Sequence, residues 1–272
     1  MPRPVSVQYR VSPTAEDLAA SAAELFASSA SATAKARGVA RVAISGGSTP
    51  KGMFALLADR SRPYFAQVPW DRLQLFWVDE RCVPPTDAES NYRMTKEALL
   101  EHVPLPAAQI HRMVGELDPE VAAARYEAAI RAAFLLEGAQ TPAFDLVLLG
   151  LGEDGHTASL FPHTEALIEM VRIVVANPVP QKETWRITLT WPVINRGREV
   201  AFLIEGAAKA QVVQDVFCGA YDPEAKPAQL VRPASGRLNL LLDAAAASML
   251  PGSADLEAAG AGSSCVATLE IS

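Results

Sequence analysis

Short runs rich in Val, Ile, Leu and aromatic residues recur along the chain, and they constrain its fold more than any other feature. Each run has the length and composition of a buried β-strand, and polar or turn-forming residues bound it. The runs are VARVAIS (39–45), LQLFWV (73–78), FDLVLL (144–149), VRIVVA (171–176), RITLT (186–190) and VAFLI (200–204). The sequence therefore predicts buried strands at these positions.

Helical stretches lie between several of these strands. Apolar residues recur at spacings of three and four in 14–37, 50–60, 90–102, 118–137 and 207–219. Ser90 or Asn91 could cap the third stretch, and Asp118 followed by Pro119 suits the cap and first position of the fourth. This alternation predicts an α/β fold with a mostly parallel sheet covered by helices on both faces. Ligands should then bind beyond the C-terminal strand ends.

The length and composition are compatible with one large domain or two small ones. Of the 272 residues, 50% are hydrophobic and 20% are charged, so a sizeable core can form. We predict a single α/β domain over residues 1–250 and a Gly/Ala/Ser-rich C-terminal extension over 251–272. No apolar run is long enough to cross a bilayer, and the N-terminus lacks the apolar stretch of a signal peptide. We therefore expect a cytoplasmic protein with no membrane partner.

The net charge and the cysteine pattern limit the classes of partner that we expect. The net charge is -7, and no block of Lys and Arg is present, so we expect no nucleic-acid partner. A small anion remains compatible, because a few convergent cations can bind it locally. Three cysteines without a CxxC pair fit a reducing compartment. No HExxH or Cys/His ligand spacing occurs, so the sequence predicts no metal site.

The first predicted strand ends in SGGSTP, residues 45–50, and a helical stretch follows. The pair Gly46 and Gly47 would let backbone amides approach an anion closely, and Ser48 and Thr49 add hydroxyl donors at the helix N-terminus. We interpret the loop as a phosphate cradle, with a plain tight turn as the alternative. The GxxxxGK[ST] spacing of a P-loop is missing.

The second predicted strand is followed by Asp79, Glu80 and Arg81. Charges are costly to bury, so we expect them to face solvent or a ligand, with a surface salt-bridge cluster as the alternative. Cys82 lies beside Arg81, but the sequence pairs it with no histidine, so we do not assign it as a nucleophile.

The third predicted strand leads into GLGEDGHTASLFP, residues 150–162. The formal GxGxxG in this loop does not indicate a dinucleotide site, because Pro162 interrupts the following helix and Asn177 stands where a ribose-binding acid is expected. Asp154 and His156 are more informative. An imidazole titrates near neutral pH and an adjacent carboxylate can orient it, so His156 is a candidate general base.

Two later cations could contact a phosphate. Arg186 begins the predicted strand RITLT, and Lys209 begins a helical stretch after the loop EGAA. Arginine binds phosphate as a planar fork and lysine as a point charge. Taken singly, each is also compatible with an ordinary surface cation.

Taken in order, SGGSTP, FWVDERCVPPTDAESNYRM, FDLVLLGLGEDGHTASLFP, RITLT and IEGAAKA resemble the motifs of the 6-phosphogluconolactonase family, over about residues 12–250. The resemblance implies hydrolysis of 6-phosphoglucono-1,5-lactone to 6-phosphogluconate, the second step of the oxidative pentose phosphate pathway, without a cofactor. It also implies a modified Rossmann-type fold like that of glucosamine-6-phosphate deaminases and ribose-5-phosphate isomerases.

The resemblance also implies roles for individual residues. His156 corresponds to the catalytic histidine, in a loop completed by Asp154 and Gly155. Arg81 is our candidate for stabilising the oxyanion, and a backbone amide near Gly155 is the alternative. The residues expected to bind the phosphate or line the sugar side are Gly46, Gly47, Ser48, Thr49, Asp79, Arg186 and Lys209. We expect a phosphorylated sugar lactone as the only partner, bound by a monomer or weak homo-oligomer.

Two other functions compete with this interpretation. The deaminases typically carry a glutamate five residues after the corresponding histidine and a tyrosine after Asp-Glu, whereas this chain has Phe161 and Arg81 there. Both differences favour the lactonase over a deaminase or another sugar-phosphate isomerase. A non-catalytic sugar-phosphate sensor would normally carry an additional module, for which the predicted domain leaves little room.

Overall fold

The larger of two β-sheets has eight strands in the order β11-β1-β10-β9-β6-β2-β3-β5. The computed structural model describes residues 5–234, 236–251 and 265–271. Every strand pair in this sheet is parallel except β1 with β11. The strands are β1 (Val5–Ser12), β2 (Ala40–Ile44), β3 (Leu73–Trp77), β5 (Ile110–His111), β6 (Leu146–Leu149), β9 (Glu199–Ile204), β10 (Arg237–Asp243) and β11 (Cys265–Ile271). The predicted mostly parallel α/β sheet is confirmed.

The smaller sheet is antiparallel and contains β4 (Asp79–Arg81), β8 (Thr184–Leu189) and β7 (Val174–Val179). The strands predicted at 171–176 and 186–190 form, but their assignment to the parallel sheet is wrong. They form a hairpin joined by the single 3-10 turn Pro180–Lys182. A parallel pair needs a crossover of a dozen or more residues, and this connection is far too short for one.

A helix forms in each of the five predicted helical stretches. The α-helices are α1 (Ala15–Arg37), α2 (Ser48–Ala58), α3 (Pro63–Gln67), α4 (Asn91–Thr95), α5 (Pro119–Phe134), α6 (Trp191–Ile194), α7 (Ala210–Phe217) and α8 (Ala244–Ala247). Three short helices, α3, α6 and α8, were not predicted. Asp118 caps α5 as predicted. Ser90 rather than Asn91 caps α4, because its side chain accepts a hydrogen bond from the Arg93 amide.

Shorter helical turns connect these elements. One is a π-helical turn, η2 (Lys96–Leu100), which continues α4. The others are 3-10 turns: η1 (Trp70–Arg72), η3 (Ala107–Gln109), η4 (Glu165–Leu167), η5 (Pro180–Lys182), η6 (Ala207–Lys209) and η7 (Pro227–Leu230).

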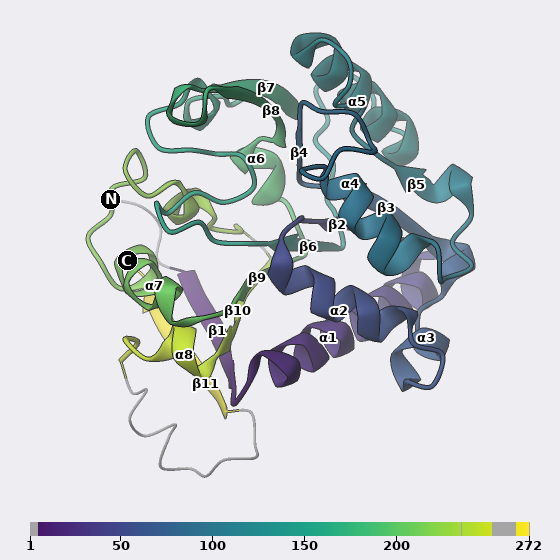
Figure 1. The fold of residues 1–272 in the computed structure, drawn as a ribbon. Helices are drawn as coiled ribbons and strands as arrows, with labels where there is room; N and C mark the ends of the chain where they lie inside the picture. The colour runs from purple at the N-terminus through teal and green to yellow at the C-terminus, as the bar shows by residue number, and fades with distance from the viewer. Residues whose placement is uncertain (1–4, 235, 252–264, 272) are drawn as a thin grey trace.

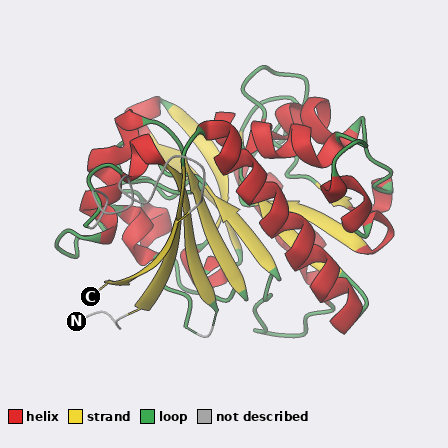
Figure 2. Ribbon diagram, turned by 90° about the horizontal axis from the view of Figure 1, so that it is seen from below, coloured by secondary structure: helices red, strands yellow, loops and turns green. Residues whose placement is uncertain are grey.

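Two apolar layers cover the opposite faces of the larger sheet, because successive side chains of a strand point to opposite faces. On one face, α1 and α2 lie side by side and pack against one set of strand residues, such as Val42 and Leu75 (Figure 1). On the other face, α5, α6, α7, α8 and the smaller sheet pack against the alternate set, such as Ala43 and Phe76. Figure 2 shows helices along both sides of the twisted sheet. In the sequence, strands that are covered on both faces appear as continuous apolar runs.

Val78 links the two sheets. It lies between β3 of the larger sheet and β4 of the smaller one. Its amide donates a hydrogen bond to the carbonyl of Ile44 (2.9 Å), and its carbonyl accepts one from the amide of Leu189 (2.8 Å). One extended segment of chain therefore takes part in the hydrogen bonding of both sheets.

Three strands at one side of the larger sheet were not predicted. β1 pairs with β10 in parallel and with β11 in antiparallel orientation. β11 lies within the predicted C-terminal extension, residues 251–272, so part of that segment adds an edge strand. Residues 252–264 lie outside the described part of the chain, and the division into a domain and an extension stays a prediction.

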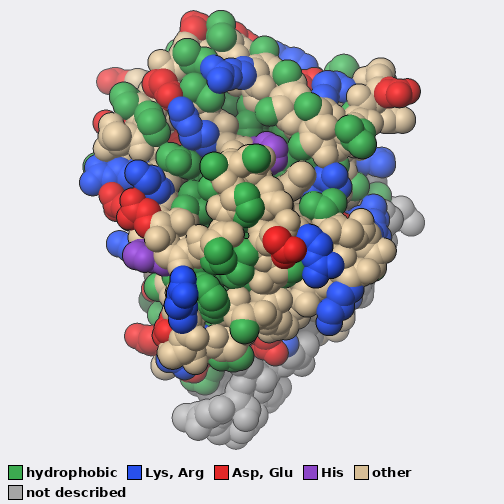
Figure 3. Space-filling model, turned by 90° about the vertical axis from the view of Figure 1, so that its right-hand side faces the viewer, with side chains coloured by type: hydrophobic (Ala, Val, Ile, Leu, Met, Phe, Trp, Pro, Cys, Tyr) green, Lys and Arg blue, Asp and Glu red, His purple; other side chains and the backbone are tan. Residues whose placement is uncertain are grey.

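Charged side chains are mixed on the face of the molecule shown in Figure 3. Lys and Arg stand singly or in small groups there, with Asp and Glu between them. Within the described residues, no helix has the length and apolar character needed to cross a membrane.

Candidate active site

A cavity of about 260 Å³ opens at the C-terminal ends of the parallel strands. Its walls come from the segments that follow β2, β3, β6 and β9, as expected for an open α/β sheet. The predicted site residues that line it are Gly46, Gly47, Ser48, Thr49, Asp79, Arg81, His156 and Lys209. The remaining predicted residues, Asp154, Gly155 and Arg186, are not part of its wall.

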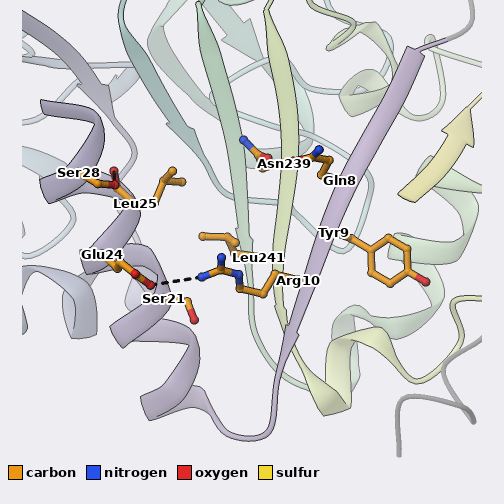
Figure 4. A pocket seen from close by; sticks show the side chains of 9 residues that line it. All are labelled: Gln8, Tyr9, Arg10, Ser21, Glu24, Leu25, Ser28, Asn239 and Leu241. Carbon is orange, nitrogen blue, oxygen red and sulfur yellow. Dashed lines mark hydrogen bonds and ion pairs between the residues drawn. The ribbon is translucent and has the colours of Figure 1, made fainter. Parts of the chain in front are cut away.

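A second cavity of about 180 Å³ lies between α1 and the strands β1 and β10. In Figure 4, Arg10 and Glu24 point toward one another, and they form an ion pair of 3.4 Å, while Tyr9 points to the other side of β1. None of the predicted site residues lines this cavity. Its one arginine is already paired with a carboxylate, so the larger cavity is the better candidate for an active site.

Two glycines connect β2 to α2. Gly47, which immediately precedes α2, has a φ of 106°, a conformation that glycine adopts without strain. Gly46 leaves no room for a side chain, because a Cβ there would lie 1.8 Å from Oδ1 of Asn91. Ser48 and Thr49 follow in the first turn of α2, whose first amides have no partner within the helix. The loop thus presents amides and hydroxyls at a helix N-terminus, which favours an anion.

Asp79 and Arg81 reach the cavity from β4. Asp79 is buried, and its Oδ2 accepts a hydrogen bond from the hydroxyl of Ser159 (2.7 Å). Asn91 donates to the carbonyl oxygen of Asp79 (3.0 Å). The guanidinium of Arg81 donates to the carbonyl of Glu89. These contacts fix a carboxylate and a guanidinium in the same wall.

The sequence led us to expect that Glu80 faces solvent or a ligand, and this expectation is wrong. Its carboxylate points into the protein. Glu80 is 2% exposed. Its oxygens accept hydrogen bonds from the amides of Arg81, Asn91 and Tyr92 and from the hydroxyl of Ser90. Burial raises the pKa of Glu80, and the hydrogen bonds from these amides partly oppose that effect. The carboxylate ties β4 to the first turn of α4.

The loop after β6 holds the imidazole of His156 against Asp154. Nδ1 of His156 lies 2.5 Å from Oδ1 of Asp154, and the same oxygen accepts a hydrogen bond from the His156 amide. Burial acts to raise the pKa of Asp154, but hydrogen bonds and charge from His156 outweigh it and lower this pKa to about 2. Gly152 makes room for the pair, since a Cβ there would lie 2.0 Å from Nδ1. Asp154 is therefore ionised near neutral pH.

Phe161 covers one face of the His156 imidazole. The two ring centroids are 4.1 Å apart and the ring planes differ by 22°. Phe161 is 4% exposed, and its carbonyl accepts a hydrogen bond from Thr164 (2.8 Å). The imidazole is thus fixed by a carboxylate at one edge and by a buried aromatic ring on one face.

Arg186 and Lys209 lie in different parts of the site. Arg186 pairs with Arg81 across β8 and β4, and it donates to the hydroxyl of Thr184 (3.0 Å). Burial, together with the positive charge of Arg81, lowers the pKa of Arg186. Lys209 ends η6, and its Nζ lies 3.8 Å from Oε1 of Glu153. The glycine loop and Lys209 follow β2 and β9 of the larger sheet, whereas Arg81 and Arg186 lie in β4 and β8 of the smaller one.

Several residues that line the cavity were not predicted as site residues, among them Asn91 and Glu205. Asn91 was considered only as a helix cap, yet its side chain fills the space beside Gly46. Glu205, at the end of β9, also lines the cavity. The glycine pair beside a buried amide is a contact between distant segments, which local sequence does not reveal.

Neither a thiolate nucleophile nor a metal cluster is supported. Burial raises the pKa of Cys82 to about 11, so the thiol stays protonated near neutral pH. Within the described residues, no group of three or more His, Cys, Asp or Glu side chains could hold a metal ion. The absence of a cofactor stays a prediction.

The arrangement combines three chemical capacities. The imidazole of His156, held by a carboxylate, can accept and return a proton. A helix N-terminus with two hydroxyls and a lysine can bind an anion. Arg81 can face negative charge that develops on a substrate oxygen. Such a set suits acyl transfer to water on a phosphorylated substrate.

Comparison with known proteins gives consistent results. Residues 13–240 match the model of a family described as glucosamine-6-phosphate isomerases/6-phosphogluconolactonase. A 6-phosphogluconolactonase of Synechocystis sp. is 44% identical over 209 residues, covering 76% of this chain and 83% of that protein. The 6-phosphogluconolactonase of Mycobacterium tuberculosis is 38% identical over 257 residues, covering 91% of this chain and 100% of that protein.

Solved structures show the same architecture. The 6-phosphogluconolactonase from Trypanosoma cruzi superposes with a TM-score of 0.77 at 31% identity, covering 89% of this chain and 96% of that one. A monomeric glucosamine-6-phosphate deaminase superposes with a TM-score of 0.72 at 21% identity, covering 89% of this chain and 99% of that one. At that identity the second likeness concerns the fold alone.

Proposed function

Since the chain belongs to the glucosamine-6-phosphate isomerase/6-phosphogluconolactonase family, we propose that it is a 6-phosphogluconolactonase. It hydrolyses 6-phosphoglucono-1,5-lactone to 6-phosphogluconate, in the pentose phosphate pathway. The observation that carries this proposal is the Asp154–His156 pair, at 2.5 Å, beside the cavity that the glycine loop and Lys209 also line. Base, anion-binding loop and cation meet in one cavity.

The proposed reaction is direct attack by water. His156 accepts a proton from a water molecule as the water oxygen bonds to the lactone carbonyl carbon C1. When the tetrahedral intermediate collapses, the bond from C1 to the ring oxygen breaks, and His156 returns the proton to that oxygen. The products are a carboxylic acid, which ionises, and a free hydroxyl group. A base and acid of this kind typically contributes about 10²- to 10⁴-fold.

Asp154 and Arg81 support different steps of this reaction. The carboxylate of Asp154 faces Nδ1, so it holds the tautomer whose Nε2 is free to accept a proton, and it stabilises the imidazolium that forms. Arg81 lines the cavity and can face the oxyanion of the intermediate. A backbone amide near Gly155 is the alternative donor.

The phosphate is proposed to bind at the start of α2. Gly46, Gly47, Ser48 and Thr49 supply amides and hydroxyls there, and Lys209 supplies a positive charge in the same wall. Arg186, which pairs with Arg81 across β8 and β4, contributes a second positive charge to phosphate binding. Binding energy from a group that does not react can then orient the lactone carbonyl.

The residue at position 161 argues against a deaminase. An activity that needs a carboxylate five residues after the histidine has none here, because the buried ring of Phe161 occupies that position and stacks on His156. The fold is shared with a deaminase, so the reaction has to be argued from the site.

The test is the rate of 6-phosphogluconate formation from freshly generated lactone, with spontaneous hydrolysis subtracted. We expect acceleration by the native protein and loss of most of it in His156→Ala, while the circular dichroism spectrum of that variant stays native-like. Glucosamine 6-phosphate is assayed in parallel for ammonia release. Ammonia release without lactone hydrolysis would replace the proposal with a deaminase. Binding of sugar phosphates without either reaction would indicate a sensor.

A cytoplasmic location and a monomeric or weakly associating state remain predictions from the sequence. Gel filtration of the purified protein tests the second of them directly.

A further inference from the structure

Lys209 differs from the other two cations of the site in its partner. Its Nζ lies 3.8 Å from Oε1 of Glu153, whereas Arg81 and Arg186 donate to carbonyl or hydroxyl oxygens. Among the residues that the structure describes, neither arginine forms an ion pair with a carboxylate. Lys209, which lines the cavity together with the glycine loop, therefore already has an anion beside it.

Glu153 is free to leave this pair. Its side chain is 70% exposed, whereas that of Lys209 is 25% exposed and lies in the wall of the cavity. At 3.8 Å the pair is longer than a direct hydrogen bond, and the Glu153 side chain makes no other ion pair or hydrogen bond in the described part of the chain. The carboxylate can therefore move into solvent without breaking another hydrogen bond or ion pair.

Other carboxylates near Lys209 are placed differently. Asp154 is next to Glu153 in the chain but is held by His156. Glu205 lines the cavity, and no ion pair joins it to Lys209 within the described residues. Of the carboxylates in the described residues, Glu153 is the one that combines an ion pair to Lys209 with an exposed side chain that makes no other ion pair or hydrogen bond.

From this geometry we infer that Glu153 competes with the phosphate of the ligand for Lys209 and so sets the affinity of the site for phosphorylated ligands. The inference rests on the proposed function in one respect, the placement of the phosphate beside Lys209. Binding of a phosphate displaces the Glu153 carboxylate into water and places a stronger anion on Lys209. The carboxylate thereby weakens the binding of small anions that make few other contacts.

The test variant is Glu153→Gln, which removes the charge and keeps the shape. Calorimetric titration with inorganic phosphate measures binding at Lys209 without any reaction. Exposed ion pairs contribute about 0.2–1 kcal/mol, which converts to a change in affinity of up to about fivefold. We therefore expect the dissociation constant of phosphate to fall about two- to fivefold. The KM for the phosphorylated lactone should fall in parallel.

Two controls separate competition from a general effect of charge. Glu137→Gln removes one surface carboxylate that makes no ion pair in the described chain, and it should leave phosphate affinity unchanged. The gain in Glu153→Gln should shrink at high salt, because ions screen an exposed pair. A change in phosphate affinity that came from altered packing would not depend on salt in this way.

An unchanged or weaker affinity for phosphate in Glu153→Gln, or an equal gain in Glu137→Gln, would overturn the inference. Failure of phosphate to bind either protein would also overturn it. Because calorimetry requires no turnover, these outcomes are distinct from failure of the proposed lactonase activity, which the rate assay on the native protein decides.

Discussion

Changing Asp154 to asparagine tests the proposed catalytic pair most directly. The variant keeps an oxygen that can accept the Nδ1 hydrogen of His156, but it removes the negative charge 2.5 Å away. A hydrogen bond to a charged group contributes about 1.5–3 kcal/mol and a neutral one about 0.5–1.5 kcal/mol. Since 40% of the Asp154 side chain is exposed, solvent screening places the loss near the lower end of the difference, at about 1 kcal/mol.

The loss should appear in kcat/KM. About 1 kcal/mol corresponds to a decrease of about fivefold, measured as 6-phosphogluconate formation below neutral pH, where spontaneous lactone opening is slow. Glu224→Gln is the matched control, because Glu224 pairs with His163 at 3.2 Å on the surface, outside the cavity. A value for Asp154→Asn within twofold of the native enzyme, or equal losses in both variants, would refute the role given to Asp154.

The same variant has an expected signature in acid. The pKa of Asp154 is about 2 in the folded protein, below its ordinary value of 3.8. A carboxyl group with a lowered pKa stabilises the fold above its ordinary pKa, and this contribution is lost as the pH falls toward the lowered value. The difference in melting temperature between native protein and Asp154→Asn should therefore be largest near neutral pH and shrink between about pH 4 and pH 2. A constant difference would contradict the pairing.

Three further predictions concern residues that hold the site in place. Gly46→Ala should lose about 1–3 kcal/mol of unfolding free energy in urea, because the new Cβ would lie 1.8 Å from the buried Asn91; an unchanged midpoint would contradict this. Glu80→Gln should lose about 1–3 kcal/mol, since an amide cannot accept all the hydrogen bonds that the carboxylate accepts, and native stability would show that the segment is held otherwise. Phe161→Leu should lower kcat by about tenfold with little change in KM, because the imidazole loses its stacking partner; a larger change in KM than in kcat would contradict a positioning role.

The sequence indicated much of the fold, and its errors have physical causes. Runs such as 39–45 and 73–78 were recognised because strands buried on both faces are continuously apolar. β1 was missed because its residues alternate, with Val7 buried and Gln8 exposed. The β7–β8 hairpin was predictable from the short connection between its strands.

Several residues of the candidate site were predicted from the sequence, but the hydrogen bonds that join its segments were not. The motif order placed Gly46, His156 and Lys209 in one cavity, and the structure brings them together there. The burial of Glu80 was not foreseen, because its partners lie about ten residues further along the chain. Hydrogen bonds between segments depend on tertiary geometry, which local patterns do not encode.

The position of Val78 in both sheets has a consequence for how the protein opens. Its amide donates a hydrogen bond to a strand of the larger sheet, and its carbonyl accepts one from a strand of the smaller sheet. Separating the two sheets therefore requires breaking one of these two backbone hydrogen bonds. The amides of Val78 and Leu189 should then exchange with deuterium at a common slow rate, as members of one cooperative unit. Residues contributed by the two sheets would keep their relative positions through the small local openings that surface loops undergo.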